Sequence, residues 1–67
     1  MRIGKINWFH ANKGYGFIVP DDKSEDVFLH VSELQKIGLV DINPGQKVSF
    51  ELENKKRKIA AIDIKLI

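Results

Sequence analysis

Ring side chains alternate with other residues in two short segments, and this pattern constrains the chain more than any other feature. The first segment reads Lys-Gly-Tyr-Gly-Phe-Ile from Lys13, and the second reads Val-Phe-Leu-His and ends at His30. Because side chains on a β-strand point alternately to opposite faces, the rings of each segment lie on one face. Two adjacent antiparallel strands would carry all four rings on one surface: Tyr15, Phe17, Phe28 and His30. The aliphatic residues between them would then face a core.

An exposed surface of rings suits a flat partner better than it suits water. Unpaired nucleic-acid bases offer such flat faces, and an aromatic ring can stack on any of them with little sequence preference. The pattern therefore indicates binding of single-stranded nucleic acid. A small protein-interaction barrel, in which the same rings dock a hydrophobic or proline-rich partner, is the alternative.

The chain has 67 residues, and we expect residues 1–67 to form one small domain. It has no cysteine, so disulfides and thiolate metal sites cannot support the core. The polar residues before Trp8 do not resemble a signal peptide, and no apolar run approaches the ~20 residues that span a bilayer. We expect a cytoplasmic monomer with no membrane contact, no small-molecule substrate, no cofactor and no metal.

The hydrophobic pattern predicts five short strands and little helix. Alternation predicts the first three strands at residues 3–10, 15–19 and 26–31. The consecutive apolar residues Trp8 and Phe9 break the alternation and indicate a bulge or a sharp bend in the first strand.

The second half of the chain predicts one helical turn and a hairpin. Residues 32–34 fit a single turn with Ser32 as its N-cap. A long connection then leads to a fourth strand from Lys47, and a turn after Asn54 leads to the fifth. Alternate residues of these strands are apolar and are predicted to face inward: Val48, Phe50, Leu52, Ala60, Ile62, Ile64 and Leu66.

Three strands, a long crossing connection and a hairpin are typical of an all-β fold, the five-stranded antiparallel Greek-key barrel of the OB type. Closure of the barrel removes most of the edge that such a small sheet would expose. An SH3-like barrel, which the same number of strands permits, is the alternative.

The net charge of +2 is a mild basic excess, and its distribution is uneven. Four of the eleven basic residues lie together at positions 55–58, and the rest of the chain is richer in acidic residues than in basic ones. Binding of nucleic acid would therefore depend on contact as well as on long-range attraction. The basic run is either a solvated hairpin tip or a supplementary phosphate contact.

At these residues the sequence resembles a cold-shock protein of the bacterial single-domain kind. The segment from Lys13 to Ile18 resembles the first ribonucleoprotein signature of that family, and Val27–His30 resembles the second. Residues 4–9, 45–48 and 50–51 are also similar, so the resemblance covers essentially the whole chain. It implies an OB-type barrel that binds single-stranded RNA and DNA as a nucleic-acid chaperone and regulator of gene expression. Because so small a barrel offers no recognisable reactive constellation, we do not expect an enzyme.

The resemblance also implies a set of binding residues. The expected stacking platform consists of five side chains: Trp8, Tyr15, Phe17, Phe28 and His30. Phe9 would lie at the margin of this platform, Lys13 would flank it with charge, and Asp26 would accept a hydrogen bond from a base edge. The residues alone leave Trp8 and Phe9 open between core and surface.

Four positions depart from the family pattern. Val31 and Leu39 stand where relatives often have phenylalanine, so two possible stacking rings are missing. Asn7 replaces a commonly basic residue, and His10 stands where asparagine is usual. We expect these changes to weaken binding and not to abolish it.

Two glycines and a histidine in these segments allow more than one interpretation. Gly14 and Gly16 are either turn and bulge glycines or positions that let a ligand approach the backbone closely, and their alternation with rings favours the ligand. His30 has neither the partners of a metal site nor those of a catalytic base. It is predicted to stack when neutral and to attract phosphate when charged, so that affinity rises as the pH falls.

Overall fold

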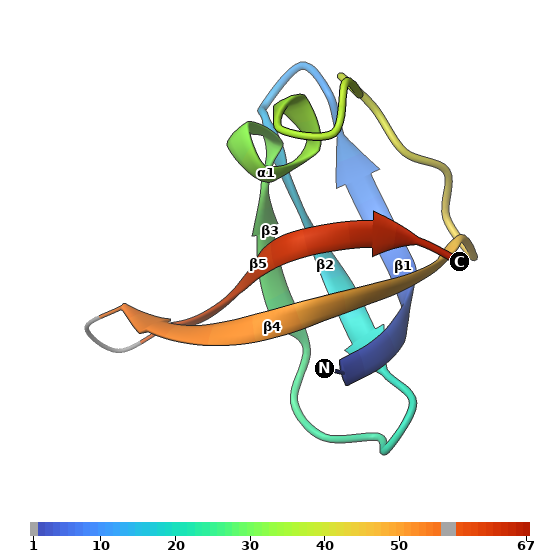
Figure 1. The fold of residues 1–67 in the computed structure, drawn as a ribbon, viewed down its shortest axis with the longest axis vertical. Helices are drawn as coiled ribbons and strands as arrows, with labels where there is room; N and C mark the ends of the chain where they lie inside the picture. The colour runs from blue at the N-terminus through green and yellow to red at the C-terminus, as the bar shows by residue number, and fades with distance from the viewer. Residues whose placement is uncertain (1, 56–57) are drawn as a thin grey trace.

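The computed structural model describes residues 2–55 and 58–67 and contains five strands and one short helix (Figure 1). The elements are β1 Arg2–His10, β2 Tyr15–Pro20, β3 Val27–His30, α1 Val31–Gln35, β4 Lys47–Lys55 and β5 Lys58–Leu66. The predicted all-β class, the five strands and the single helical turn are confirmed. Within the described ranges no helix is long and apolar enough to span a membrane.

The five strands form one sheet that closes on itself. The strand order is β1-β2-β3-β5-β4, and β4 pairs back with β1. The expectation of a wholly antiparallel sheet is wrong at one junction, because β3 and β5 are parallel where Phe28 lies opposite Ala60. A closed ring with an odd number of strands cannot alternate in direction throughout, so one parallel pair is unavoidable.

A bulge in β1 decides which of its side chains face outward. Ile6 pairs with Ile18 and Trp8 pairs with Phe17, so Asn7 is the extra residue between them. The predicted irregularity in this strand is therefore confirmed, just before Trp8. Because side chains alternate along a strand, the inserted residue turns Trp8 to the outer surface although Ile6 is buried.

The core lies inside the closed sheet. It consists of Ile6, Ile18, Val27, Leu29, Leu34, Ile42, Val48, Phe50, Ala61 and Ile64. The inward prediction is confirmed for Val48, Phe50 and Ile64. Leu52 and Leu66 pair with the core residues Ala61 and Val48 but are 36% and 49% exposed, so they are not buried as expected.

A second bulge changes the side of Ile62, which was predicted to face inward but pairs with the exposed Glu51. The register of β4 against β5 shifts between Ser49 and Glu51, and Asp63 has a φ of 53° in the left-handed region. As a result Ala61 and Ile64 both face the core although they are three residues apart, which simple alternation cannot predict.

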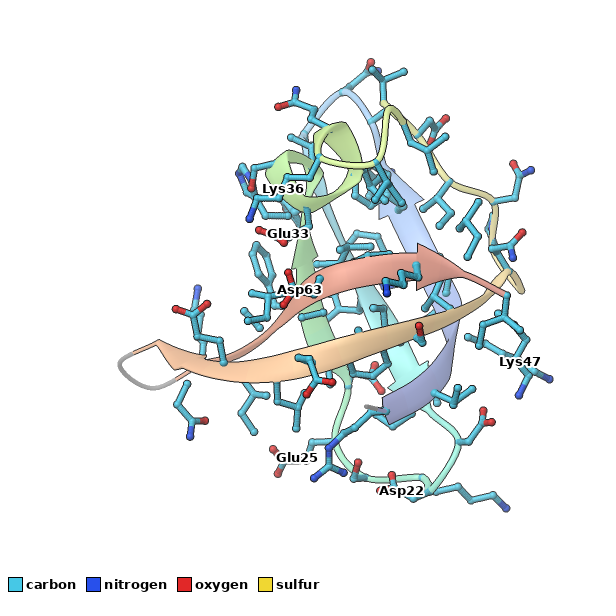
Figure 2. The ribbon with its side chains drawn as sticks, in the orientation of Figure 1. Asp22, Glu25, Glu33, Lys36, Lys47 and Asp63 are labelled. Atoms are coloured by element: carbon cyan, nitrogen blue, oxygen red, sulfur yellow. The ribbon has the colours of Figure 1, made fainter. Side chains whose placement is uncertain are left out.

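A buried carboxylate connects helix α1 to this bulge (Figure 2). Glu33 is only 8% exposed, and its Oε1 accepts a hydrogen bond from the Asp63 backbone N–H at 3.3 Å. The ammonium group of Lys36 lies 3.1 Å from Glu33 Oε2 and compensates its charge. Glu33 therefore satisfies a backbone donor of β5 that the irregular pairing leaves available.

The fold itself accounts for the two glycines near the rings. A Cβ on Gly16 would lie 2.3 Å from the Trp8 carbonyl oxygen and 2.7 Å from Phe9 Cα, so the close contact of β1 with β2 requires glycine there. Gly14 has a φ of 79° in the β1–β2 turn, where glycine is favoured. The close approach that Gly16 permits is therefore that of β1.

Candidate nucleic-acid interface

The strand register arranges the outward rings in two rows that cross β1, β2 and β3. Trp8 pairs with Phe17, which pairs with Phe28. Two residues along each strand, His10 pairs with Tyr15, which pairs with His30. We call the first the apolar row (Trp8, Phe17 and Phe28) and the second the polar row (His10, Tyr15 and His30).

The rings of the two rows are in mutual contact. Within the apolar row, the ring centroids of Trp8 and Phe17 are 5.2 Å apart, and those of Phe17 and Phe28 are 5.9 Å apart. Between the rows, Tyr15 stacks on Phe28 at 5.9 Å with an interplanar angle of 28°. Such distances are typical of attractive aromatic pairs. Since none of these rings is fully buried, they form one continuous surface that a ligand can reach.

An open cavity of about 860 Å³ lies against the apolar row. Its lining residues are Trp8, Tyr15, Phe17, Glu25, Asp26, Phe28, Lys58 and Ile59. Asp26 is therefore at the ring surface, where the sequence predicted it. Glu25 and Ile59 were not predicted, and Lys58 was considered only as part of the basic run, because the loop before β3 and the start of β5 meet the rings only in the folded chain.

Lys58 brings a positive charge to this surface. Its Nζ lies 5.9 Å from the centroid of the Phe28 ring, within the range of a cation–π contact. Lys58 is thus exposed beside the rings. Residues 56–57 of the same basic run lie outside the described residues.

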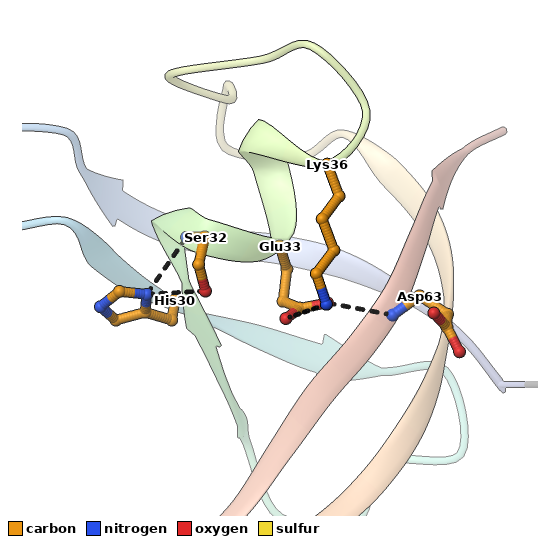
Figure 3. A network of polar contacts seen from close by, with 5 residues as sticks. All are labelled: His30, Ser32, Glu33, Lys36 and Asp63. Atoms are coloured by element: carbon orange, nitrogen blue, oxygen red, sulfur yellow. Dashed lines mark hydrogen bonds and ion pairs between the residues drawn. The ribbon is translucent and has the colours of Figure 1, made fainter.

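His30 has a structural role in addition to its place in the polar row (Figure 3). It is the N-cap of α1: its Nδ1 accepts the Ser32 backbone N–H at 3.1 Å and lies 3.0 Å from Ser32 Oγ. The prediction of Ser32 as the cap is therefore wrong. Because a backbone N–H only donates, Nδ1 is unprotonated and the neutral ring carries its proton on Nε2.

Comparison with known proteins identifies the family of the chain. Residues 2–67 match the family model of the "'Cold-shock' DNA-binding domain". The chain belongs to the cold-shock domain family. This is a nucleic-acid-binding, non-enzymatic family, and the resemblance found in the sequence is confirmed.

Named relatives match the cold-shock protein over nearly its whole length. A probable cold shock protein of Sinorhizobium fredii is 48% identical over 63 residues, which is 91% of each chain. A cold shock-like protein of Rickettsia bellii is 41% identical and covers 96% of this chain and 91% of its own. The major cold shock protein of Micrococcus luteus is 39% identical over 96% of each chain. The chain is therefore a nucleic-acid-binding cold-shock protein.

Two of the expected binding residues of the cold-shock protein lie apart from the ring contacts. Phe9 faces Gly16 across the β1–β2 pair and packs against the core. Lys13 is exposed in the β1–β2 turn, where its backbone N–H donates to the His10 carbonyl oxygen at 3.1 Å. Leu39, which replaces a ring common in relatives, also packs against the core. The structure therefore gathers Trp8 and the four alternating rings but not Phe9.

His10 is the ring that the sequence analysis missed. Its imidazole centroid lies 4.8 Å from that of Trp8, and its Cα is opposite that of Tyr15. The signal was present in the sequence, because His10 is two residues from Trp8 and must face the same side of β1. The side of His10 could not be inferred from this spacing, because the sequence left the side of Trp8 undecided.

Proposed function

We propose that the cold-shock protein binds single-stranded RNA and DNA by stacking bases on the apolar row. The continuous, partly exposed surface of Trp8, Phe17 and Phe28 is the observation that carries this proposal. A base stacked on a protein ring contributes about 1–3 kcal/mol. Three such stacks give on the order of 3–9 kcal/mol before the cost of ordering the strand, which is enough to hold a single strand without base-specific contacts.

The charges around the cavity support an orientation for the bound strand. The exposed carboxylates of Glu25 and Asp26 repel phosphates but accept hydrogen bonds from base N–H groups. Lys58 is the cation beside the same cavity, so it is the expected phosphate partner there. Base edges would point to the carboxylates and the backbone to Lys58. Because few cations lie near the rings among the residues that the structure describes, the salt dependence of binding should be shallow, at about 0.7 in the log–log slope for each phosphate contact.

The biological role that follows is that of a nucleic-acid chaperone and regulator of gene expression in the cytoplasm. A protein that binds only unpaired segments shifts RNA hairpins toward the open form by mass action and needs no nucleotide hydrolysis. We propose that residues 1–67 act as one domain and as a monomer.

We also infer that the closed sheet is a Greek-key barrel of the OB type. The order β4-β1-β2-β3 and the antiparallel pairing within it support this assignment, since they define a Greek key. Strand β5 then completes the ring between β3 and β4.

A fluorescence titration tests the proposed function. Trp8 is the only tryptophan and belongs to the apolar row, so a bound oligothymidine should change its emission in a saturable way. Phe17→Ala should weaken binding about fivefold or more, with circular dichroism verifying that the variant is folded. A duplex of the same length should compete poorly. No response of the wild-type protein to any single strand would reject the proposal and favour the protein-interaction alternative.

A further inference from the structure

His10 differs from the other rings of the surface because the fold makes no use of its side chain. Within the part of the chain that the structure describes, no hydrogen bond or ion pair engages its imidazole, and its one ring contact is to Trp8. The side chain is exposed at the end of β1, on the same face as the proposed base-binding rings. Both ring nitrogens are therefore available to a ligand.

His30, at the opposite end of the polar row, is constrained where His10 is not. Its Nδ1 is occupied by the Ser32 backbone N–H, and addition of a proton there would uncap α1. His10 can gain a proton without the loss of any contact in the protein. An imidazole gains its charge between about pH 8 and pH 5, so the two histidines should respond differently over this range.

The surroundings of His10 set the sign of the charge that it would bind. Tyr15 lies opposite it on β2, and Lys13 lies in the adjoining turn, so no carboxylate is close to it on these elements. Among the described residues, the other charged groups near the rings are Glu25, Asp26 and Lys58 around the cavity by the apolar row, and Glu33 beside His30. A protonated His10 with Lys13 in the adjoining turn therefore forms a positive end of the ring surface, outside the lining of the cavity that Glu25 and Asp26 share.

We propose that His10 is a further nucleic-acid-binding residue, which binds a phosphate of the strand next to the base on Trp8 when its imidazole is protonated. The inference rests on the proposed stacking function and adds to it a binding affinity that rises as the pH falls. His10 is the residue responsible for this rise, and His30 contributes as a ring at every pH in the range.

The test replaces histidine by asparagine at each end of the polar row. Asparagine has no charge to gain at either position, and at position 30 it is a favoured N-cap that preserves α1. Affinity for a labelled oligothymidine of about six nucleotides is measured by fluorescence anisotropy at pH 8 and at about pH 5.5. Thymidine strands have no group that titrates between these values, so the pH response belongs to the protein.

The wild-type protein should bind about two- to fivefold more tightly at the lower pH, as expected for one exposed ion pair. The slope of log affinity against log salt should be steeper there by about 0.7. His10→Asn should bind at pH 8 and lose both effects, whereas His30→Asn should keep both. The proposal is overturned if His10→Asn retains the wild-type pH response, or if the wild-type protein binds equally well at both pH values. A wild-type protein that fails to bind at pH 8 would instead overturn the proposed stacking function.

Discussion

The same substitution at two phenylalanines separates the binding surface from the core. Phe28 lies in the apolar row and contacts the rings of Tyr15 and Phe17, whereas Phe9 packs against the core opposite Gly16. Replacement by leucine keeps most of the apolar volume at either position but removes the flat face. Phe28→Leu should therefore weaken binding of oligothymidine, and Phe9→Leu should not.

The structure gives the expected magnitudes. Loss of one base stack at Phe28 costs about 1–2 kcal/mol of binding free energy, which is a five- to thirtyfold weaker affinity. Phe9→Leu changes the shape of a partly buried side chain, so it should lower the free energy of unfolding by about 1 kcal/mol. Phe28→Leu should therefore show its effect in the binding assay, and Phe9→Leu in the unfolding assay.

Both variants are compared by the titration of Trp8 fluorescence and by urea unfolding at the same temperature. Binding is measured where circular dichroism shows more than about nine-tenths of each variant to be folded. The reasoning is refuted if Phe9→Leu loses as much affinity as Phe28→Leu, because stacking would then extend to a ring that the fold turns inward. It is also refuted if Phe28→Leu binds like the wild-type protein.

Three further outcomes test the fold that supports this surface. Gly16→Ala should lower the free energy of unfolding by about 2 kcal/mol or more, because the added Cβ would lie 2.3 Å from the Trp8 carbonyl oxygen and force β1 and β2 apart. An unchanged urea midpoint would contradict this. Asp63→Gly should raise the free energy of unfolding by up to about 1 kcal/mol, since glycine adopts a φ of 53° without the cost that aspartate bears; a lower melting temperature would argue against it. The Ser24 hydroxyl, and then the Ser24 backbone N–H, lowers the pKa of Asp22 below its ordinary value of 3.8, so Ser24→Ala should raise that pKa. Because the folded pKa is depressed, the contribution of the Asp22 carboxylate to stability is present above that ordinary value and is lost as the pH falls through the folded pKa. A carboxyl NMR titration that is identical in the variant would disprove the role of Ser24.

The part of the site on β2 and β3 could be predicted from the sequence because both strands keep strict alternation. Tyr15 and Phe17 pair with His30 and Phe28, so a period of two was sufficient to place four rings on one surface. Glu25 and Lys58 could not be found in this way, because they reach the cavity from a loop and from a strand distant in sequence. Their place depends on closure of the sheet, which local patterns do not determine.

The error at Ile62 in the second half of the chain has a physical cause. A period-two pattern assumes that every residue of a strand has one partner, and the bulge at Asp63 breaks this assumption. The apolar pattern of β5 also lacks a strong signal, since isoleucine and leucine occur on both of its faces. The error in the helix cap has a different origin: serine is the more common N-cap, and the contact of His30 Nδ1 with the Ser32 N–H depends on the three-dimensional path from β3 into α1.

The bulge at Asn7 connects the core to the proposed function. Ile6 faces inward before it, and Trp8 and His10 face outward after it, while Phe9 takes the inward position between them. A regular strand of the same sequence would turn Trp8 and His10 inward and expose Phe9. The large indole would then compete for the space that Ile18 and Phe50 fill, and both rows would lose their β1 ring. One inserted residue therefore sets the side of three neighbouring rings. For this reason β1 contributes Trp8 and His10 to the ring surface, while Phe9 between them packs against the core.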